Sequence, residues 1–369
     1  MNTAVSHNMG RKMGFAVTAL ATGVAAVLGT ASAEGLREGD SALKNGRIGY
    51  VLTTKNWGVY QNADNSECPQ GFNDGPREQF KKLFPEGKKR SIVEAQLARE
   101  GEQWHPTTQP ESLKFLEAGG KVTYGLNLDG KIGPEDFSSP EGEPGVDNQL
   151  FRAIGCIGHY RVDGTIHHFE NLFMRSYDDM RIVLELSDVD NLKNDDDVTV
   201  TTYRGSDGLL QDATGEGFIP GGTQRIDMRF GKDYIYSMKG KIVDGVLKTQ
   251  PADRVMLPWA STFGATGHHV IRGFQLQLNL DTKTATGLMA GYVDVNAFRH
   301  QLNTTWSTHH HSYGQLSSPS LYKAMSRLAD GYPDPKTGKN TAISSAITVK
   351  FVQTYVVHPE EEKQLVVKK

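Results

Sequence analysis

Residues 274–280 read FQLQLNL, and this stretch decides the fold class. Four apolar residues, Phe274, Leu276, Leu278 and Leu280, alternate with polar ones. Successive side chains of a strand point to opposite faces, so a period of two predicts a strand with one face on a core and the other toward solvent. This pattern is typical of antiparallel sheets.

Similar signals lie on both sides of this stretch in the sequence. Three Asp-Gly pairs, at 129–130, 163–164 and 244–245, follow alternating or β-branched residues and supply the positive φ angles of two-residue hairpin turns. Together these signals favour a mainly β chain, an antiparallel β-sandwich or barrel-like architecture with a few short helices. Further strands are predicted at residues 181–187, 198–203, 225–230, 287–295 and 347–357.

Three short helices are predicted from capping patterns. Ser91 with Glu94 forms a capping box, Asp147 can cap a helix that runs to Ile154, and a Ser-Pro pair at 318–319 begins the third. The resulting division of the chain is a signal peptide at 1–33, an N-terminal region with short helices at 34–120, a β-rich main domain at 121–358 and a flexible C-terminal tail at 359–369.

The first 33 residues have the three parts of a secretory signal peptide. Arg11 and Lys12 form a positive flank, an apolar run of small residues follows, and Ala31, Ser32 and Ala33 supply an A-x-A exit. The run is shorter than the roughly 20 strongly apolar residues that a membrane span needs, and no later segment reaches that length. We therefore expect cleavage after Ala33 and a periplasmic or secreted mature protein without a membrane span.

Charge and cysteine content fit that location. Cleavage would remove two basic side chains and no acidic ones, which leaves 38 basic against 43 acidic residues and a net charge of −5. This mild acidity argues against nucleic acid as a partner, because nucleic acid demands a concentrated basic face. Cys68 and Cys156 are a candidate disulfide in an oxidising compartment, and two buried thiols are the alternative.

An acidic turn between two predicted strands is the candidate metal site. Its crowded oxygen atoms suit Ca²⁺, which takes about six to eight oxygen ligands, although the glycine and closing glutamate of an EF-hand are missing. The alternative is a solvated turn in which Asp and Asn side chains cap backbone groups. The predicted calcium ligands are Asp188, Asp190, Asn191, Asp195 and Asp197.

Histidines and one aromatic loop are the other candidate sites. A zinc centre would have to be assembled from separate segments, for example by His168, His269 and His310, and surface hydrogen bonding is the alternative. A loop that mixes rings with hydrogen-bonding side chains suits a sugar or an aromatic ligand, and a buried tryptophan is the alternative. The predicted ligand-binding residues are Trp306, His309, His310, His311 and Tyr313.

A resemblance rests on residues 145–150 (GVDNQL), followed downstream by 194–200 (NDDDVTV). This pattern, with strand-rich sequence over about 125–357, resembles uncharacterised secreted proteins of Gram-negative bacteria. The resemblance implies export and a β-rich fold. It implies no catalytic residue.

The sequence leaves three functional hypotheses open. The first is an exported β-sandwich protein that binds a carbohydrate or another small molecule, with calcium as a structural ion. The second is a metal-assisted hydrolase or lyase that uses the histidines. The third is a structural or accessory protein of a cell-envelope assembly, paired through exposed strand edges. Nucleophile-elbow and Walker motifs are missing from the sequence.

Overall fold

The computed structural model describes residues 42–73, 98–100, 103–105, 115–162, 164–178, 181–259, 267–304 and 318–360. The chain divides into two compact units, Met1–Glu34 and Gly35–Lys369, and every described residue belongs to the second. The predicted signal peptide, the capping box at Ser91 and most of the predicted tail lie outside the described residues.

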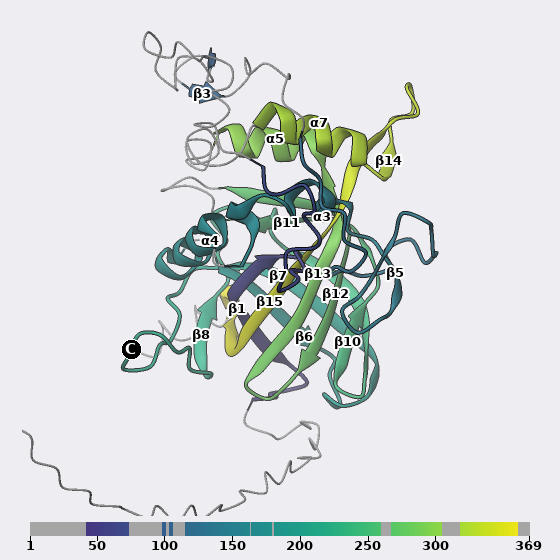
Figure 1. Ribbon diagram of the computed structural model, residues 1–369. Coiled ribbons are helices and arrows are strands. Elements are labelled where there is room, and N and C mark those ends of the chain that lie inside the picture. Colours follow the sequence, from purple (N-terminus) through teal and green to yellow (C-terminus); the bar gives the residue numbers. More distant parts are fainter. Residues whose placement is uncertain are drawn as a thin grey trace, which may run out of the picture. The chain divides into compact units, whose positions relative to one another are not determined.

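A closed, eight-stranded antiparallel barrel forms the centre of the described part of the chain (Figure 1). Its strands follow one another around the wall in chain order, so most of the wall is built from local connections. Pairing of the last strand with the first closes the barrel. The strands are β1 (Ile48–Trp57), β6 (Arg181–Ser187), β7 (Asp195–Gly205), β9 (Tyr236–Val243), β10 (Val246–Thr249), β12 (His268–Leu280), β13 (Thr284–Asp294) and β15 (Asn340–Val357).

Alternating apolar side chains fill the barrel. Phe274, Leu276 and Leu278 of β12 are at most 1% exposed and belong to the main core. Phe351 of β15 and Leu52 of β1 face each other across the closing pair and lie in the same core. Because eight strands enclose a space that side chains can fill or that can hold one small ligand, the content of the interior decides what this barrel can do.

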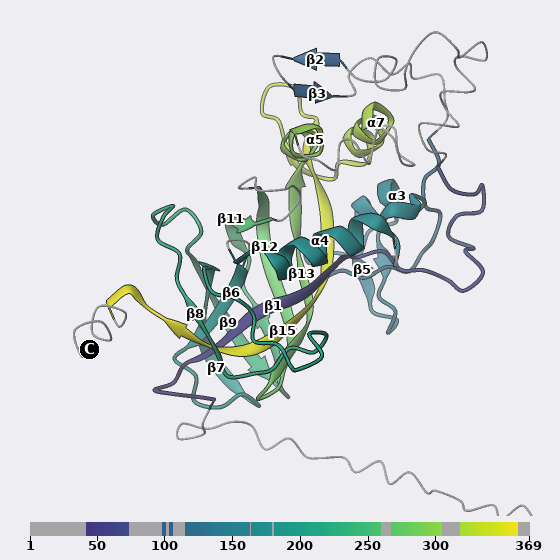
Figure 2. The same ribbon diagram turned by 90° about the vertical axis from the view of Figure 1, so that its left-hand side faces the viewer.

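Shorter elements complete the described part. The additional strands are β2 (Ala98–Glu100), β3 (Gln103–His105), β4 (Phe137–Ser138), β5 (Pro144–Val146), β8 (Gly222–Arg225), β11 (Ala252–Pro258) and β14 (Gly331–Pro333). The helices are α3 (Gln149–Ile154), the short 3-10 helix η1 (Gly158–Tyr160), α4 (Thr165–Ser176), α5 (Val295–Thr304) and α7 (Ser318–Leu328). Helices α5 and α7 lie at one end of the barrel, at the top of Figures 1 and 2.

At this end the wall departs from a regular barrel. Strands β10 and β11 both pair with β12, one after the other, and their registers differ by one residue. Pro251, which lacks a backbone N–H, lies between the two strands. On the opposite side, β1 pairs with β6 only over Ile48–Val51. The second half of β1 therefore has β15 on one side and no strand of the described chain on the other.

Helix α4 occupies that side of β1 (Figure 2). Asn171 accepts a hydrogen bond from the Lys55 backbone N–H at 2.9 Å and donates one to the Lys55 carbonyl at 2.8 Å. Arg175 donates to the Thr53 carbonyl at 3.1 Å. Side chains of α4 thus satisfy the backbone groups that a neighbouring strand would otherwise pair, and the wall at this end is part helix.

The prediction of a mainly β, barrel-like chain with few short helices is confirmed. Residues 181–187 form β6, and residues 198–203, 287–294 and 347–357 lie within β7, β13 and β15. The Asp-Gly pair at 244–245 forms the β9–β10 hairpin turn, with φ of 51° at Asp244 and 82° at Gly245. The helix that begins at Ser318 is also present as α7.

Several local predictions were wrong. The Asp-Gly pair at 163–164 is not a hairpin turn, because helix α4 begins at Thr165, and its apolar residues recur with helical rather than strand spacing. Gly164 lies at the helix start because a Cβ there would be 2.4 Å from the His159 carbonyl oxygen. The pair at 129–130 lies in a turn flanked by the isolated bridge between Leu126 and Asp147.

Other corrections concern element ends and missed elements. The N-cap of α3 is Asn148, one residue after the predicted Asp147. Of residues 225–230, only Arg225 lies in a strand. Strand β1 and helix α5 were not predicted, and β1 lies in the region at 34–120 that was expected to contain short helices.

None of the helices in the described ranges is both long and apolar enough to cross a membrane.

Candidate functional site

The predicted aromatic-loop site cannot be placed. Its five residues, Trp306, His309, His310, His311 and Tyr313, lie outside the described residues. The described helices on either side of it in the sequence, α5 and α7, contact each other at the same end of the barrel.

The acidic turn lies between β6 and β7, as predicted, and its side chains cap backbone groups. Asp195 accepts hydrogen bonds from the N–H groups of Asp190 at 2.8 Å and Asp197 at 3.2 Å. Asn191 accepts from Lys193 N–H, and Asp188 accepts from the Thr199 hydroxyl. No three His, Cys, Asp or Glu side chains of the described chain are grouped as metal ligands. The arrangement supports the capping interpretation of this turn.

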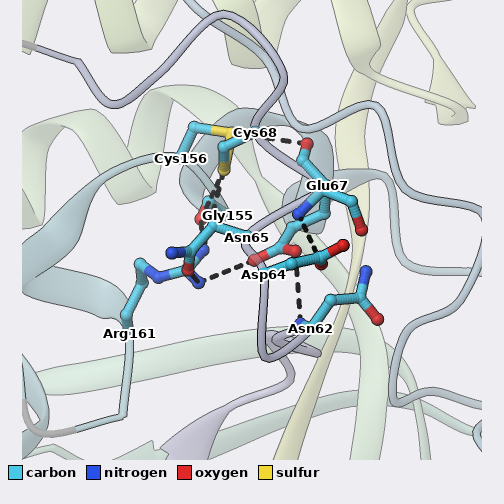
Figure 3. Close-up of polar contacts among 9 residues, drawn as sticks. Asn62, Asp64, Asn65, Glu67, Cys68, Gly155, Cys156 and Arg161 are labelled. Atoms are coloured by element: carbon cyan, nitrogen blue, oxygen red, sulfur yellow. Dashed lines mark hydrogen bonds and ion pairs between the residues drawn. A yellow bond between two sulfur atoms is a disulfide. The ribbon is translucent and has the colours of Figure 1, made fainter.

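The predicted disulfide between Cys68 and Cys156 is confirmed. Beside it, the Arg161 guanidinium donates to Glu67 Oε1 at 2.6 Å, to Asn65 Oδ1 at 2.8 Å and to the Gly155 carbonyl at 2.8 Å (Figure 3). The residues Glu67 and Arg161 are 1% and 7% exposed. This buried ion pair and the disulfide together join the segment after β1 to residues 156–161, which follow α3.

The GVDNQL stretch also has a structural role. Asp147 accepts hydrogen bonds from the N–H groups of Leu128 and Asp129, and Asn148 donates to the Gly58 and Tyr124 carbonyls. Burial raises the pKa of the Asp147 carboxyl to about 6 in spite of the two backbone hydrogen bonds. These contacts connect the loops before α3 to the region that follows β1.

A different cluster, inside the barrel, has the properties of a functional site. Its centre is Lys55 on β1. The register of β1 against β15 shifts between Leu52 and Thr54, and the shift brings Lys55 opposite Val349 and Trp57 opposite Ile347. Directly opposed residues share a face of the sheet, so Lys55 and Trp57 project into the core that contains Val349 and Ile347. The Lys55 side chain is 2% exposed.

Glu170 of α4 is the counter-ion of this lysine. Glu170 Oε2 lies 3.5 Å from Lys55 Nζ, and Glu170 Oε1 accepts a hydrogen bond from Trp259 Nε1 at 3.2 Å. Trp259 directly follows β11, and Lys55 belongs to β1. One carboxylate on the helix therefore contacts both β1 and the residue that follows β11.

Aromatic rings surround the pair. Lys55 Nζ lies 3.0 Å from the centroid of the Trp259 ring, which favours the ammonium form through a cation–π interaction. His269 of β12 packs on Trp259 with a centroid distance of 4.6 Å, and Trp57 lies 5.5 Å from both Trp259 and Phe298 of α5. We call Lys55, Glu170, Trp57, Trp259, His269 and Phe298 the barrel-end cluster.

In the barrel-end cluster, the attraction between Lys55 and Glu170 does not fully offset the loss of hydration of the two charges. Burial lowers the pKa of the Lys55 amine from 10.5 to about 8, against the opposing effect of Glu170. Burial likewise raises the pKa of the Glu170 carboxyl, against the effect of Lys55 and the Trp259 N–H. Both shifts move the pair toward a neutral amine beside a protonated carboxyl group, and such perturbed groups are typical of functional sites.

The histidines predicted as zinc ligands lie in different environments. His269 is buried in the barrel-end cluster. His168 lies on helix α4, next to the Phe169 ring. His310 is outside the described residues. A metal-dependent enzyme thus stays a prediction.

Searches against protein-family models, curated proteins and solved structures found no match. The resemblance to secreted proteins of Gram-negative bacteria stays a prediction.

Sequence reasoning missed the barrel-end cluster because its members are far apart in the chain and because a bulge sets the direction of Lys55. Tyr50 and Leu52 are core residues at even positions, so uninterrupted alternation would place Lys55 on the outer face. The available signal was a lysine and a tryptophan two residues apart at the end of a β-branched run, TTKNW.

Proposed function

We propose that this protein binds a small, mostly apolar molecule that carries one polar group, at the barrel-end cluster. The observation that carries the proposal is a buried amine–carboxylate pair enclosed by aromatic rings inside a barrel. Ligand sites in proteins are mainly apolar and aromatic, with a few polar groups that fix orientation. Three tryptophan or phenylalanine rings and one charge pair favour such a molecule over a carbohydrate.

Stability alone is a weak reason for this pair. A buried ion pair is often no more stabilising than apolar side chains of similar volume, because both charges lose their hydration. The long 3.5 Å contact between Lys55 and Glu170 makes the compensation poor. A recognition role gives the two charges a function that apolar residues could not supply.

Helix α4 offers a route to the cluster. The hydrogen bonds of α4 with the β1 backbone are made by side chains, whereas neighbouring strands of the wall pair through backbone ladders. A small displacement of the helix would uncover Glu170 and Lys55 and leave the strand pairing intact. We infer that the ligand enters beside α4, at the second half of β1.

Tryptophan fluorescence tests the proposal, because Trp57 and Trp259 lie in the cluster. We would titrate the full mature chain with a panel of one- and two-ring aromatic alcohols, aldehydes and carboxylates. We expect quenching and a raised melting temperature with at least one of them, and weaker binding in Glu170→Gln. The control variant Lys239→Met changes an exposed lysine on β9 and should bind as the wild type does. If no compound changes emission or melting, the proposed function is wrong.

We also infer that the protein is exported, which the disulfide and the signal-like sequence at 1–33 support. Expression in a Gram-negative host followed by N-terminal sequencing checks this. The mature chain should begin at Glu34. An uncleaved N-terminus in the cell extract would contradict export.

A further inference from the structure

We propose that Lys55 is a carbonyl-reactive residue and that the ligands of the barrel-end cluster are aldehydes or ketones, held as an imine on the Lys55 amine. This inference rests on the proposed function and names the ligand class. Lysine amines act as nucleophiles toward carbonyl groups when an apolar environment keeps part of their population neutral.

The geometry supplies the groups that imine formation needs. Lys55 Nζ lies 3.5 Å from a carboxyl oxygen of Glu170, and the Trp259 indole N–H holds the other carboxyl oxygen at 3.2 Å. The carboxyl group is therefore fixed beside the amine. The rings of Trp57 and Trp259 form the apolar surroundings of the pair.

The chemical step balances without an oxidant or reductant. The Nζ lone pair forms a bond to the carbonyl carbon, the carbonyl π electrons move to the oxygen, and a proton passes from nitrogen to oxygen to give a carbinolamine. Glu170 then donates a proton to the hydroxyl group, the C–O bond breaks and water leaves, while the nitrogen lone pair forms the C=N bond of an iminium ion. The Glu170 carboxylate takes back the N–H proton, which leaves the neutral imine and a protonated Glu170. Water is the only other product, and hydrolysis reverses the reaction.

Burial supports this assignment, since it lowers the pKa of Lys55 and raises that of Glu170. A neutral nucleophile and a protonated acid are the two forms that the step consumes. Lys239, on the outside of β9, provides a contrast, because its hydrogen bond with Asp197 raises its pKa and keeps it protonated. At neutral pH the two lysines should therefore differ in reactivity toward the same aldehyde.

The test is reductive trapping on the full mature chain. The protein is incubated at pH 7.5 with cinnamaldehyde, reduced with sodium cyanoborohydride, digested and analysed by mass spectrometry. Lys55 should gain the mass of the aldehyde less one oxygen atom, at an occupancy at least about tenfold above that of Lys239. Lys55→Met and Lys55→Arg should lose this adduct, and Lys239→Met should keep it.

Cinnamyl alcohol separates this inference from the proposed function. The alcohol has the same ring and chain but cannot form an imine. If the alcohol quenches tryptophan fluorescence and the aldehyde leaves no adduct on Lys55, the imine is disproved while ligand binding stands. Equal labelling of Lys55 and Lys239 also overturns the imine. Circular dichroism and melting of each Lys55 variant establish that the loss of the adduct does not come from unfolding.

Discussion

Two of the buried cation–carboxylate pairs in the described part of the chain differ in how well they are compensated. Arg161 and Glu67, beside the disulfide, make a 2.6 Å contact, and their remaining polar atoms bond to Asn65, Gly155 and the Asn62 N–H. Lys55 and Glu170 are 3.5 Å apart and lie among aromatic rings. The same type of charge pair is therefore structural in one place and poised for reaction in the other.

The pKa shifts of the two carboxyl groups reflect this difference. Burial alone would raise the pKa of Glu67, but hydrogen bonds from the backbone and Arg161 outweigh it, and the net shift is downward. At Glu170 burial dominates and the pKa is raised. The balance between burial and the stabilising contacts of each carboxylate decides the direction, and burial is the larger effect only at Glu170.

The largest expected effect is the loss of Arg161. Arg161→Met leaves Glu67 buried without its cation, and we expect the free energy of unfolding to fall by about 3 to 5 kcal/mol. Denaturant unfolding of the oxidised protein measures this change. The control Arg225→Met removes an arginine that is half exposed and paired with Asp207, and it should cost less than about 1 kcal/mol. Equal effects of the two substitutions would contradict the comparison.

The second prediction concerns the complete removal of the barrel-end charges. The double variant Lys55→Met/Glu170→Gln should be as stable as the wild type or up to about 3 kcal/mol more stable, because two poorly compensated charges no longer lose their hydration. The matched double variant Arg161→Met/Glu67→Gln should remain destabilised, since the Gly155 carbonyl and Asn65 lose their donor. A destabilised barrel-end double variant would assign that pair a structural role.

The two pairs should also respond to pH in opposite ranges. The lowered pKa of Glu67 gives stability that is present above its ordinary value of 4.5 and is lost as the pH falls through the folded pKa. The lowered pKa of Lys55 means that its charge destabilises the folded protein, and this destabilisation is complete below about pH 8. It disappears as the pH rises toward 10.5, because in this range the unfolded chain binds more protons than the folded chain. The stability difference between the wild type and Lys55→Met/Glu170→Gln should therefore shrink between pH 8 and 10.5. Urea unfolding across this range checks it, and a constant difference would contradict the assignment.

The smallest expected effect is that of calcium removal. In the turn between β6 and β7, Asp195 and Asn191 are already bonded to backbone N–H groups. We expect the melting temperature to be the same with excess Ca²⁺ and with a chelator. A drop of several degrees with the chelator would restore the calcium prediction for this turn.

Local patterns predicted those elements whose conformation depends on neighbours in the chain. The predictions of strand β12 from its alternation and of the hairpin turn after β9 from its Asp-Gly pair were correct, because side-chain period and turn φ angles are local properties. The prediction of a hairpin turn at the Asp-Gly pair 163–164 was wrong, because the helical spacing of Ile166, Phe169 and Phe173 outweighed the turn signal.

The candidate site could not be predicted from the sequence, because it depends on tertiary contacts. The sequence by itself determined the fold class, the candidate disulfide and the signal-like start of the chain, because composition and period are visible in one dimension. Tertiary structure alone decided that Lys55 faces inward, that Glu170 reaches it from α4 and that the Trp259 ring packs on the Lys55 amine. A bulge and a helix in place of a strand arise from pairing between distant segments, and that pairing leaves no periodic trace in the sequence.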